Sequence, residues 1–271
     1  WVPSVVSDSG TQVAGQSAGL PALVLLAQRQ AATTRIGLSA PSTEEAWTLP
    51  ASLDGALVGC SELSLAGDGT LVGQARRPEE LDLPSSSPAF LTVHNVTDGV
   101  VRSDLVDNLI ISPEARSVHQ REVLAQLADG AYSGVQLSYM GVDPALRDDL
   151  TAMIGELAGA VHGAGKKVAI TLPQPHRSGQ GWDSGAYDWQ ALGATVDYVR
   201  IPALAGTDAY ALGGQMDSYL TWATDQVDRA KIDLFLSAEG TDRSGDAAAA
   251  ISYQAALSTL ADDLATSGGT T

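Results

Sequence analysis

Apolar and polar positions along this chain follow the pattern of a repeating strand-and-helix fold. Short apolar runs of strand length are each followed by a longer segment with apolar residues at helical spacing. The segment 144–163 is a clear example, because an apolar residue recurs every three or four positions and Gly163 and Gly165 follow as terminators. From residue 135 onward the strands recur about every 30 to 34 residues, the length of one β-α unit, which predicts parallel strands joined by right-handed crossovers. The expected strands in this part are 135–139, 168–172, 198–203 and 232–237.

The N-terminal half adds three more expected strands. Residues 90–94 and 56–65 are apolar enough for buried strands, and the first strand is either 22–27 or 35–39. A helix is expected around 247–265. These elements predict an α/β fold, a (β/α)₈ TIM-type barrel, but such a barrel needs one strand more than the chain shows. The eighth strand either lies beyond Thr271 or is missing.

Composition suggests how the chain is divided. Ser- and Gly-rich residues near the start make 1–20 a linker or N-terminal arm, 21–265 the barrel and 266–271 a polar tail. The chain starts at Trp1 without an initiator Met or a signal peptide, so we expect a processed or excised piece.

The charge balance excludes two classes of partner. The formal net charge is −17, from 32 acidic and 15 basic residues, whereas nucleic acids and anionic membranes select basic surfaces. No apolar run approaches the ~18–20 residues of a membrane span. Cys60 is the one cysteine, so no internal disulfide can form, and its apolar neighbours favour a small buried side chain.

The most informative stretch is residues 134–142, Gly-Val-Gln-Leu-Ser-Tyr-Met-Gly-Val. Side chains alternate between the two faces of a strand. One face therefore carries apolar or aromatic residues and the other carries Gln136, Ser138 and Met140. In a parallel barrel the second set would point toward the C-terminal rim, where such barrels place their chemistry.

This stretch resembles the active-site strand of glycoside hydrolase family 18, the chitinases and spore peptidoglycan glucosaminidases. That strand reads Asp-x-x-Asp-x-Asp-x-Glu, and here Ser133, Gln136, Ser138 and Met140 stand where the family has acids. The resemblance covers roughly residues 50–265. It includes the turn Asp68-Gly69-Thr70 and Leu91–Asn95, which is similar to the family's Leu-Val-His-Asn.

The resemblance implies a mechanism that this chain lacks the residues to perform. In the family the glutamic acid protonates the glycosidic oxygen while the substrate's own N-acetyl group attacks, held by a neighbouring aspartate. Met140 has no proton to donate and Ser138 carries no charge. The sixth-strand Met-Thr-Tyr-Asp, which holds the acetamido group, aligns here with Pro-Ala followed by Leu204 and Ala205. We therefore predict no family-type glycosidase activity and no catalytic residues, and the resemblance implies no cofactor.

Several other residues are candidates for binding at the rim. Tyr139 and Trp182 could stack on sugar faces, as could Tyr210. Arg200 points inward by alternation and needs either a partner, for which Glu239 is favoured, or a ligand.

His94 and Asn95 could also reach the rim. His119 and His162 are expected on solvated helix surfaces, and no acid stands at metal-ligand spacing beside His94 or His176, so a metal site is not favoured.

Three functional hypotheses follow from these observations. The first is a non-catalytic structural or interaction module of an extracellular or cell-envelope protein, with other domains or subunits of a surface assembly as partners. The alternative is a lectin-like binder of N-acetylglucosamine-containing glycan, either chitin or peptidoglycan. The third is a glycosidase that uses residues outside the family pattern, such as Glu239. The altered rim favours the first hypothesis, because a glycan-binding domain would be expected to keep the aromatic side chain on which the sugar ring stacks.

Overall fold

The structure is a computed structural model, and part of the chain is described in it. Its contacts divide the chain into two units, residues 31–236 and a second unit made of 1–30 with 237–271. In the second unit the structure describes one antiparallel strand pair, β13 (Gly240–Asp242) and β14 (Ala249–Ile251). The first unit is described, with side chains, over residues 62–75, 77–80, 88–128, 132–179, 181–204 and 209–235, and by backbone alone over 37–39, 57–61, 129 and 207–208.

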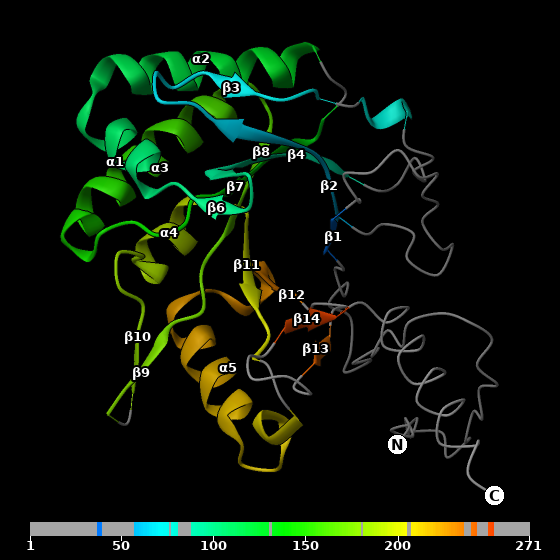
Figure 1. The fold of residues 1–271 in the computed structure, drawn as a ribbon, viewed down its shortest axis with the longest axis vertical. Helices are drawn as coiled ribbons and strands as arrows, with labels where there is room; N and C mark the ends of the chain where they lie inside the picture. The colour runs from blue at the N-terminus through cyan, green and yellow to red at the C-terminus, as the bar shows by residue number, and fades with distance from the viewer. Residues whose placement is uncertain are drawn as a thin grey trace, which may run out of the picture. The chain divides into compact units, whose positions relative to one another are not determined.

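A parallel sheet forms the centre of the first unit (Figure 1). Its strand order is β1-β2-β4-β7-β8-β11-β12, each strand parallel to its neighbours, and the short β3 (Leu71–Val72) pairs antiparallel with β2. The two end strands, β1 and β12, approach each other in space, so the sheet curls back toward itself. The parallel strands are β1 Gly37–Ser39, β2 Leu57–Leu65, β4 Ala89–His94, β7 Gly134–Ser138, β8 Lys167–Thr171, β11 Tyr198–Pro202 and β12 Ile232–Phe235.

Helices connect these strands and cover the outer face of the sheet (Figure 1). The five α-helices in the described part are α1 Ser103–Ile111, α2 Pro113–Asp129, α3 Arg147–Gly163, α4 Trp189–Thr195 and α5 Gln215–Gln226. Two short hairpins extend from the C-terminal ends of strands, β5 (Val96–Thr97) with β6 (Val100–Val101) and β9 (His176–Ser178) with β10 (Gly181–Asp183). Four short 3₁₀ segments complete the described elements, at Pro78–Glu80, Pro144–Leu146, Thr207–Tyr210 and Arg229–Lys231.

Most of the expected strands are confirmed. The strands predicted from the apolar runs correspond to β2, β4, β7, β8, β11 and β12. Of the two candidates for the first strand, 35–39 contains β1, and 22–27 lies outside the described residues. The helix expected at 247–265 is wrong at its start, because residues 249–251 form β14; the rest of it lies outside the described residues. The boundaries 1–20, 21–265 and 266–271 stay a prediction.

Helix α3 shows how the sequence fixes one of these elements. The Asp143 carboxylate accepts a hydrogen bond from the Ala145 amide at the start of the 3₁₀ turn that leads into the helix. At the other end Gly165 adopts a φ of +72°, where a side chain would be strained. The Lys166 amide bonds back to the Val161 carbonyl. Cap and terminator therefore set the length of the helix that follows β7.

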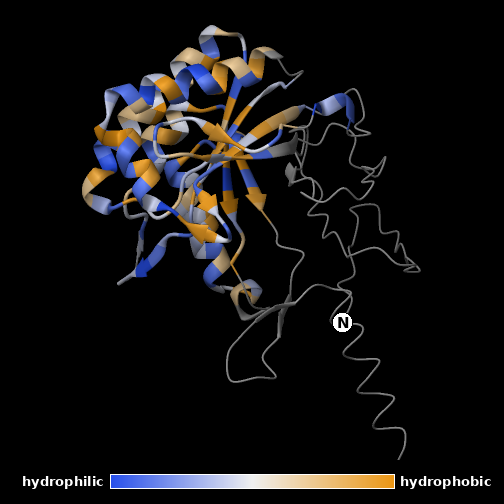
Figure 2. Cartoon of the chain, turned by 45° about the horizontal axis from the view of Figure 1, so that its top comes forward, coloured by the Kyte–Doolittle hydropathy of each residue, from blue (hydrophilic) through white to orange (hydrophobic). Residues whose placement is uncertain are grey.

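The core lies between the outer face of the sheet and the helices (Figure 2). Val135 and Leu137 on β7 are fully buried there, together with Ile154 and Val161 of α3. The other face of β7 points away from the helices and cannot be filled by apolar side chains along its whole length. A Cβ at Gly134 would stand 2.1 Å from the Lys167 carbonyl oxygen, so glycine is needed where the strands close in on each other.

Aromatic packing closes the inner face at the N-terminal ends of the strands. The Phe90 and Tyr198 rings meet edge to face at 5.8 Å, and Ala169 packs against them. The Lys167 ammonium donates to the Tyr198 hydroxyl at 3.0 Å. Because this end is filled, space inside the curled sheet remains at the C-terminal ends of the strands.

The expectation that His119 is solvated is wrong. His119 on α2 is 4% exposed, and its two ring nitrogens contact the Gly69 carbonyl oxygen at 3.2 Å and the Tyr139 hydroxyl at 2.5 Å. The carbonyl can only accept, so Nδ1 carries the proton and Nε2 accepts from the phenol. The turn before β3 also packs tightly on α2, because a Cβ at Gly69 would lie 2.1 Å from the Ala115 carbonyl oxygen. His119 thus ties together the β2–β3 turn, α2 and the end of β7.

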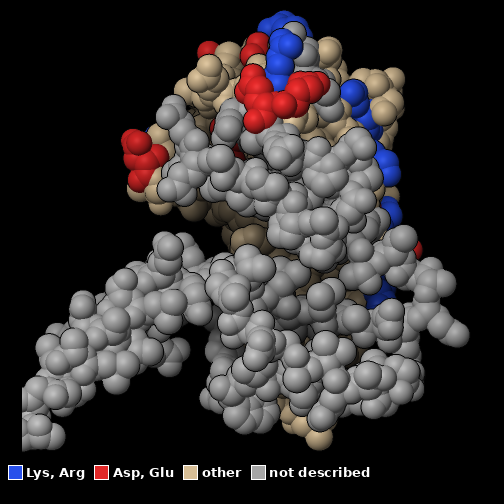
Figure 3. All heavy atoms as spheres, turned by 90° about the vertical axis from the view of Figure 1, so that its right-hand side faces the viewer, with Lys and Arg blue, Asp and Glu red and all other residues tan. Residues whose placement is uncertain are grey.

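Surface features of the described residues are ordinary. No helix among them is long and apolar enough to cross a membrane. On the face shown in Figure 3, Lys and Arg side chains of described residues lie at the top and along the right-hand edge, and Asp and Glu side chains lie mainly at the top and on the left.

Acid should weaken the fold through His119. Burial lowers the pKa of the His119 imidazole to about 4, while the hydrogen bond to the Gly69 carbonyl opposes this shift. An unfolded chain protonates this group near ~6.5, so the contribution of the neutral imidazole is complete above that pH and is lost as the pH falls from ~6.5 to ~4. We expect the free energy of unfolding to drop by about 2–3 kcal/mol more in the native protein than in His119→Gln between about pH 7 and 4.5, measured by urea denaturation. His176→Gln, an exposed control, should keep the native slope; equal slopes for the native protein and His119→Gln would contradict this role.

Candidate binding cavity

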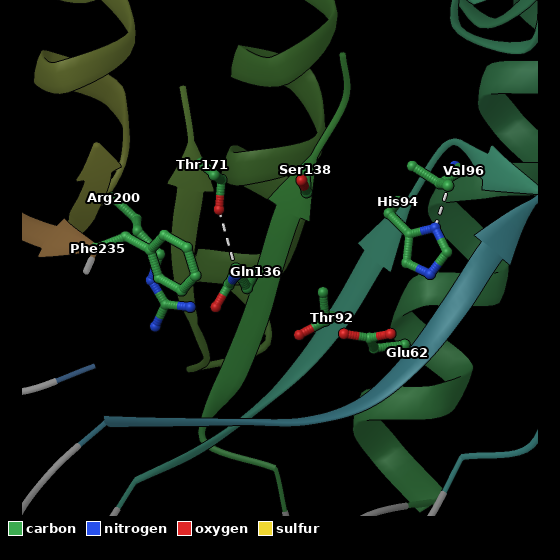
Figure 4. A pocket seen from close by; sticks show the side chains of 9 residues that line it. All are labelled: Glu62, Thr92, His94, Val96, Gln136, Ser138, Thr171, Arg200 and Phe235. Carbon is green, nitrogen blue, oxygen red and sulfur yellow. Dashed lines mark hydrogen bonds between the residues drawn. The ribbon is translucent and has the colours of Figure 1, made fainter. Parts of the chain in front are cut away.

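A cavity of about 370 Å³ opens at the C-terminal ends of the parallel strands (Figure 4). Its walls come from the inward-facing residues of β2, β4, β7, β8, β11 and β12, and from the start of the β5–β6 hairpin. Strand alternation explains this lining, because every second side chain points away from the helices. The lining residues are Glu62, Thr92, His94, Val96, Gln136, Ser138, Thr171, Arg200 and Phe235.

The β7 residues that replace the family acids are found in different places. Gln136 and Ser138 line the cavity. Ser133 lies at the opposite end of the strand, where its amide donates to the Ala89 carbonyl at 2.7 Å. Met140, partly buried, follows β7 and is not part of the cavity wall, and Leu204 is 5% exposed in the core. Ala205 lies outside the described residues.

Asn95 holds main chain rather than facing a ligand. It is fully buried, and its Nδ2 donates to the carbonyl oxygens of Arg102 at 2.9 Å and Met140 at 2.8 Å. The Met140 amide returns a bond of 2.8 Å to Asn95 Oδ1. One donor of this amide thus holds the main chain at Arg102 and the other holds it at Met140, which leaves no donor of the Asn95 side chain for a ligand.

The predicted stacking aromatics are not in the cavity wall. Tyr139 is 3% exposed with its ring on the helix side of β7, and burial raises the pKa of its hydroxyl. Trp182 on β10 packs against the Tyr219 ring at 5.3 Å and under the Arg177 guanidinium at 5.3 Å. Tyr210 is half exposed and is not a lining residue either. Tyr139 therefore offers no open face for a sugar.

Arg200 does reach the cavity, as alternation predicted. It is 4% exposed, and its register partner on β12 is Asp233, also buried. Burial lowers the pKa of the Arg200 guanidinium, and the Asp233 carboxylate partly offsets that shift. Glu239, the partner predicted from the sequence, lies outside the described residues. An acid in the middle of the apolar run Ile-Asp-Leu-Phe was the signal for Asp233.

His94 is positioned as a hydrogen-bond donor. The Val96 amide donates to His94 Nδ1 at 3.1 Å, so the neutral ring carries its proton on Nε2. Ser138 is the register partner of His94 on β7. With Nδ1 already occupied and Nε2 protonated, His94 cannot act as a base toward the Ser138 hydroxyl.

Four lining residues were not singled out from the sequence: Thr92, Val96, Thr171 and Phe235. Glu62 was noted only as a departure from the family's second strand, yet it is the one carboxylate among the lining residues. Phe235 is 40% exposed at the cavity. In the sequence, these residues could have been found only from the alternation of each strand, which predicts the side chains that point inward. Within the part of the chain that the structure describes, no group of three or more His, Cys, Asp or Glu residues is arranged to hold a metal ion.

Comparisons with known proteins were made at the level of family, sequence and structure. No family model matches the chain. The sporulation-specific glycosylase YdhD of Bacillus subtilis is 27% identical over 112 residues, which are 41% of this chain and 26% of that protein. The match thus spans about a quarter of that relative's length.

Solved structures give the wider similarity. The crystal structure of YdhD superposes with a TM-score of 0.63 at 22% identity, covering 74% of this chain and 72% of that one. A chitinase from Chromobacterium violaceum gives 0.61 at 21% identity, over 76% of this chain and 68% of that one. The spore cortex-lytic enzyme SleL of Bacillus cereus gives 0.66 at 18%, over 84% of this chain and 58% of that one.

The chain has the chitinase-like fold. The fold expected from the resemblance to glycoside hydrolase family 18 is thereby confirmed. These identities are low, and the similarity is one of architecture: a parallel sheet whose strands end at a common rim.

Arg200 and Asp233 are buried register partners of opposite charge, and the charge of the Asp233 carboxylate opposes the lowering of the Arg200 pKa by burial, so they yield a stability prediction. Removing one member of a buried ion pair leaves an uncompensated charge, which typically costs about 3–5 kcal/mol, whereas replacing both with apolar residues is often nearly neutral. We expect Asp233→Leu to lower the free energy of unfolding by about 3 kcal/mol and the double variant Asp233→Leu with Arg200→Met to recover more than half of that loss. Urea denaturation of the three proteins measures this. Additive losses in the double variant would show that the two residues are not coupled.

Proposed function

We propose that this chain is a non-catalytic carbohydrate-binding domain of the chitinase-like fold. The observation that carries the proposal is the cavity at the strand ends, which retains polar walls although neither Ser138 nor Met140 can do the chemistry of an acid. A glycosidase of the family kind needs a proton donor at the bond it breaks, and a positioned general acid is typically worth about 10²–10⁴ in rate. A binding site needs only shape and hydrogen bonds.

The lining suits a sugar better than a charged metabolite. Most of its polar groups are hydroxyls, an amide and an imidazole, supplied by Thr92, Ser138, Thr171, Gln136 and His94. Phe235 adds an exposed aromatic ring at the same cavity. Concave sites with an apolar surface and a few oriented polar groups are typical of small-ligand binding.

Known proteins of similar fold support a carbohydrate ligand and a cell-envelope setting. By name they are a sporulation-specific glycosylase, chitinases and spore cortex-lytic enzymes. We infer that this chain acts in the cell envelope or outside the cell, next to other domains or subunits of a surface assembly. The ranking of a structural role above glycan binding, which the sequence favoured, is reversed here because the cavity persists.

A structural or interaction module remains the second candidate. The observation in its favour is a set of exposed apolar side chains outside the cavity, with Leu212 fully exposed and Val100 and Val101 of β6 about half exposed. A partner protein could cover such residues.

Hydrolysis should be absent. Chitooligosaccharides, peptidoglycan and cello-oligosaccharides should survive prolonged incubation with the pure protein, because Ser138 and Met140, which stand at the family's acid positions, have no carboxyl group to act as general acid. Product release is measured by chromatography with reducing-sugar detection. Turnover abolished by Glu62→Gln or by Glu239→Gln would contradict the proposal and support the third hypothesis, an enzyme with residues outside the family pattern.

Binding should depend on Phe235. We expect titration calorimetry to show saturable binding of at least one β-1,4-linked tetrasaccharide, cellotetraose or the tetramer of N-acetylglucosamine, and Phe235→Ala to weaken it about 10-fold or more, as expected for a lost stacking contact of about 1.4 kcal/mol. Tyr210→Ala, which removes an aromatic ring outside the cavity, is the matched control and should bind like the native protein. Absence of binding at millimolar sugar would favour the structural role.

A further inference from the structure

We propose that Gln136 is a specificity-determining residue of the cavity and that it selects saccharides with two adjacent free hydroxyl groups. This inference rests on the proposed carbohydrate-binding function and names the ligand class of the same site. The resemblance says of this position only that an acid of the family is replaced by glutamine, and the inference gives that glutamine a role.

The Gln136 side chain contains an unused hydrogen-bond acceptor. Gln136 is 4% exposed in the middle of β7, and its Nε2 donates to the Thr171 hydroxyl at 3.2 Å. Among the residues that the structure describes, its Oε1 has no hydrogen-bond partner, and this atom is buried. Burying such an atom without a partner costs desolvation free energy. A ligand hydroxyl that donates to Oε1 would recover this cost, so the native cavity favours a ligand with a donor at this point.

Arg200 determines which way the Gln136 amide faces. Gln136 and Arg200 lie on β7 and β11 with β8 between them, so their backbones are about 10 Å apart. Both side chains are long and line the same cavity, and Figure 4 shows the Gln136 oxygen on the side of the guanidinium. The reverse amide orientation would turn an NH₂ group toward the guanidinium, placing two donors face to face. The wall therefore presents an acceptor beside a cationic donor.

An acceptor beside a donor on one wall fits a particular chemical group. Two hydroxyls on neighbouring carbons can do both tasks, since one donates to Gln136 Oε1 while the other accepts from the Arg200 guanidinium. A secondary amide cannot, because its N–H and C=O point in opposite directions across a planar trans bond. The wall thus favours an unmodified internal β-1,4-linked ring, which has adjacent hydroxyls at carbons 2 and 3, over an internal ring with an acetamido group at carbon 2.

Contact with Gln136 requires a small side-chain rotation. In the unliganded cavity Oε1 exposes almost no surface to water. Its amide is held by one hydrogen bond of 3.2 Å to the Thr171 hydroxyl. Rotation about the side-chain torsions therefore loses at most this hydrogen bond. A hydroxyl that enters along the cavity can then donate a hydrogen bond to Oε1.

Two tetrasaccharides with the same β-1,4 backbone test the inference. Cellotetraose carries a hydroxyl at carbon 2 of each ring, and the N-acetylglucosamine tetramer carries an acetamido group there. By titration calorimetry we expect the native protein to bind cellotetraose about 10-fold more tightly, a difference of about 1.4 kcal/mol. Gln136→Leu should bring the two affinities within about threefold of each other by weakening cellotetraose alone. Gln136→Glu keeps an acceptor at this position and should keep the preference for cellotetraose.

The controls separate this inference from the function on which it rests. Gln190→Leu, an exposed position on α4, should behave like the native protein, and thermal unfolding of each variant shows that it is folded. If both sugars bind equally, or the acetylated one binds more tightly, the role of Gln136 is overturned while carbohydrate binding stands. The same holds if Gln136→Leu leaves the preference intact. If neither sugar binds at millimolar concentration, the role and the proposed function fall together.

Discussion

The alternation of side chains along β7 is the constraint on which the rest of this molecule depends. Val135 and Leu137 are fully buried against the helices. Because side chains alternate along a strand, Gln136 and Ser138 then point into the curled sheet. A shift of the strand by one residue would exchange the two sets and place an amide and a hydroxyl in the core. The apolar face therefore fixes the register of the strand, and the register fixes which residues form the cavity.

The same reasoning shows what the sequence could predict. Local periodicity located β7, α3 and the glycine that ends α3, because both the strand and the helix pattern are set by neighbours along the chain. It could not place His119, whose partners Gly69 and Tyr139 are 50 and 20 residues away. A polar residue on a helix of mixed composition looks solvated until the tertiary contacts are known.

The cavity was predictable in part, for the same physical reason. The inward direction of Arg200 followed from strand alternation, but its neighbour Asp233 belongs to a different strand and is found only through the pairing of β11 with β12. Asn95 was a candidate for ligand binding because it ends β4 at the rim. Its amide instead binds the main chain of Met140, 45 residues away. Such roles depend on contacts between segments that are far apart in the sequence. The sequence of one strand does not show those contacts.

The rim of this protein combines a firmly held main chain with chemically altered side chains. Asn95 bonds both the amide and the carbonyl of Met140, and the Tyr187 hydroxyl donates to the Tyr139 carbonyl at 2.9 Å. The position where the resembling enzymes carry their acid is thus rigid although it carries a thioether. Rigid walls reduce the entropy lost when a ligand is ordered, so this arrangement suits binding without requiring chemistry.

A crystal structure of the protein soaked with cellotetraose tests the central claim most directly. The account predicts an intact sugar in the cavity, with one ring against Phe235 and a hydroxyl within hydrogen-bond distance of Gln136 Oε1. A cleaved sugar would contradict the loss of catalysis. A sugar bound elsewhere, or an empty cavity at saturating ligand, would contradict the assignment of this cavity as a carbohydrate site.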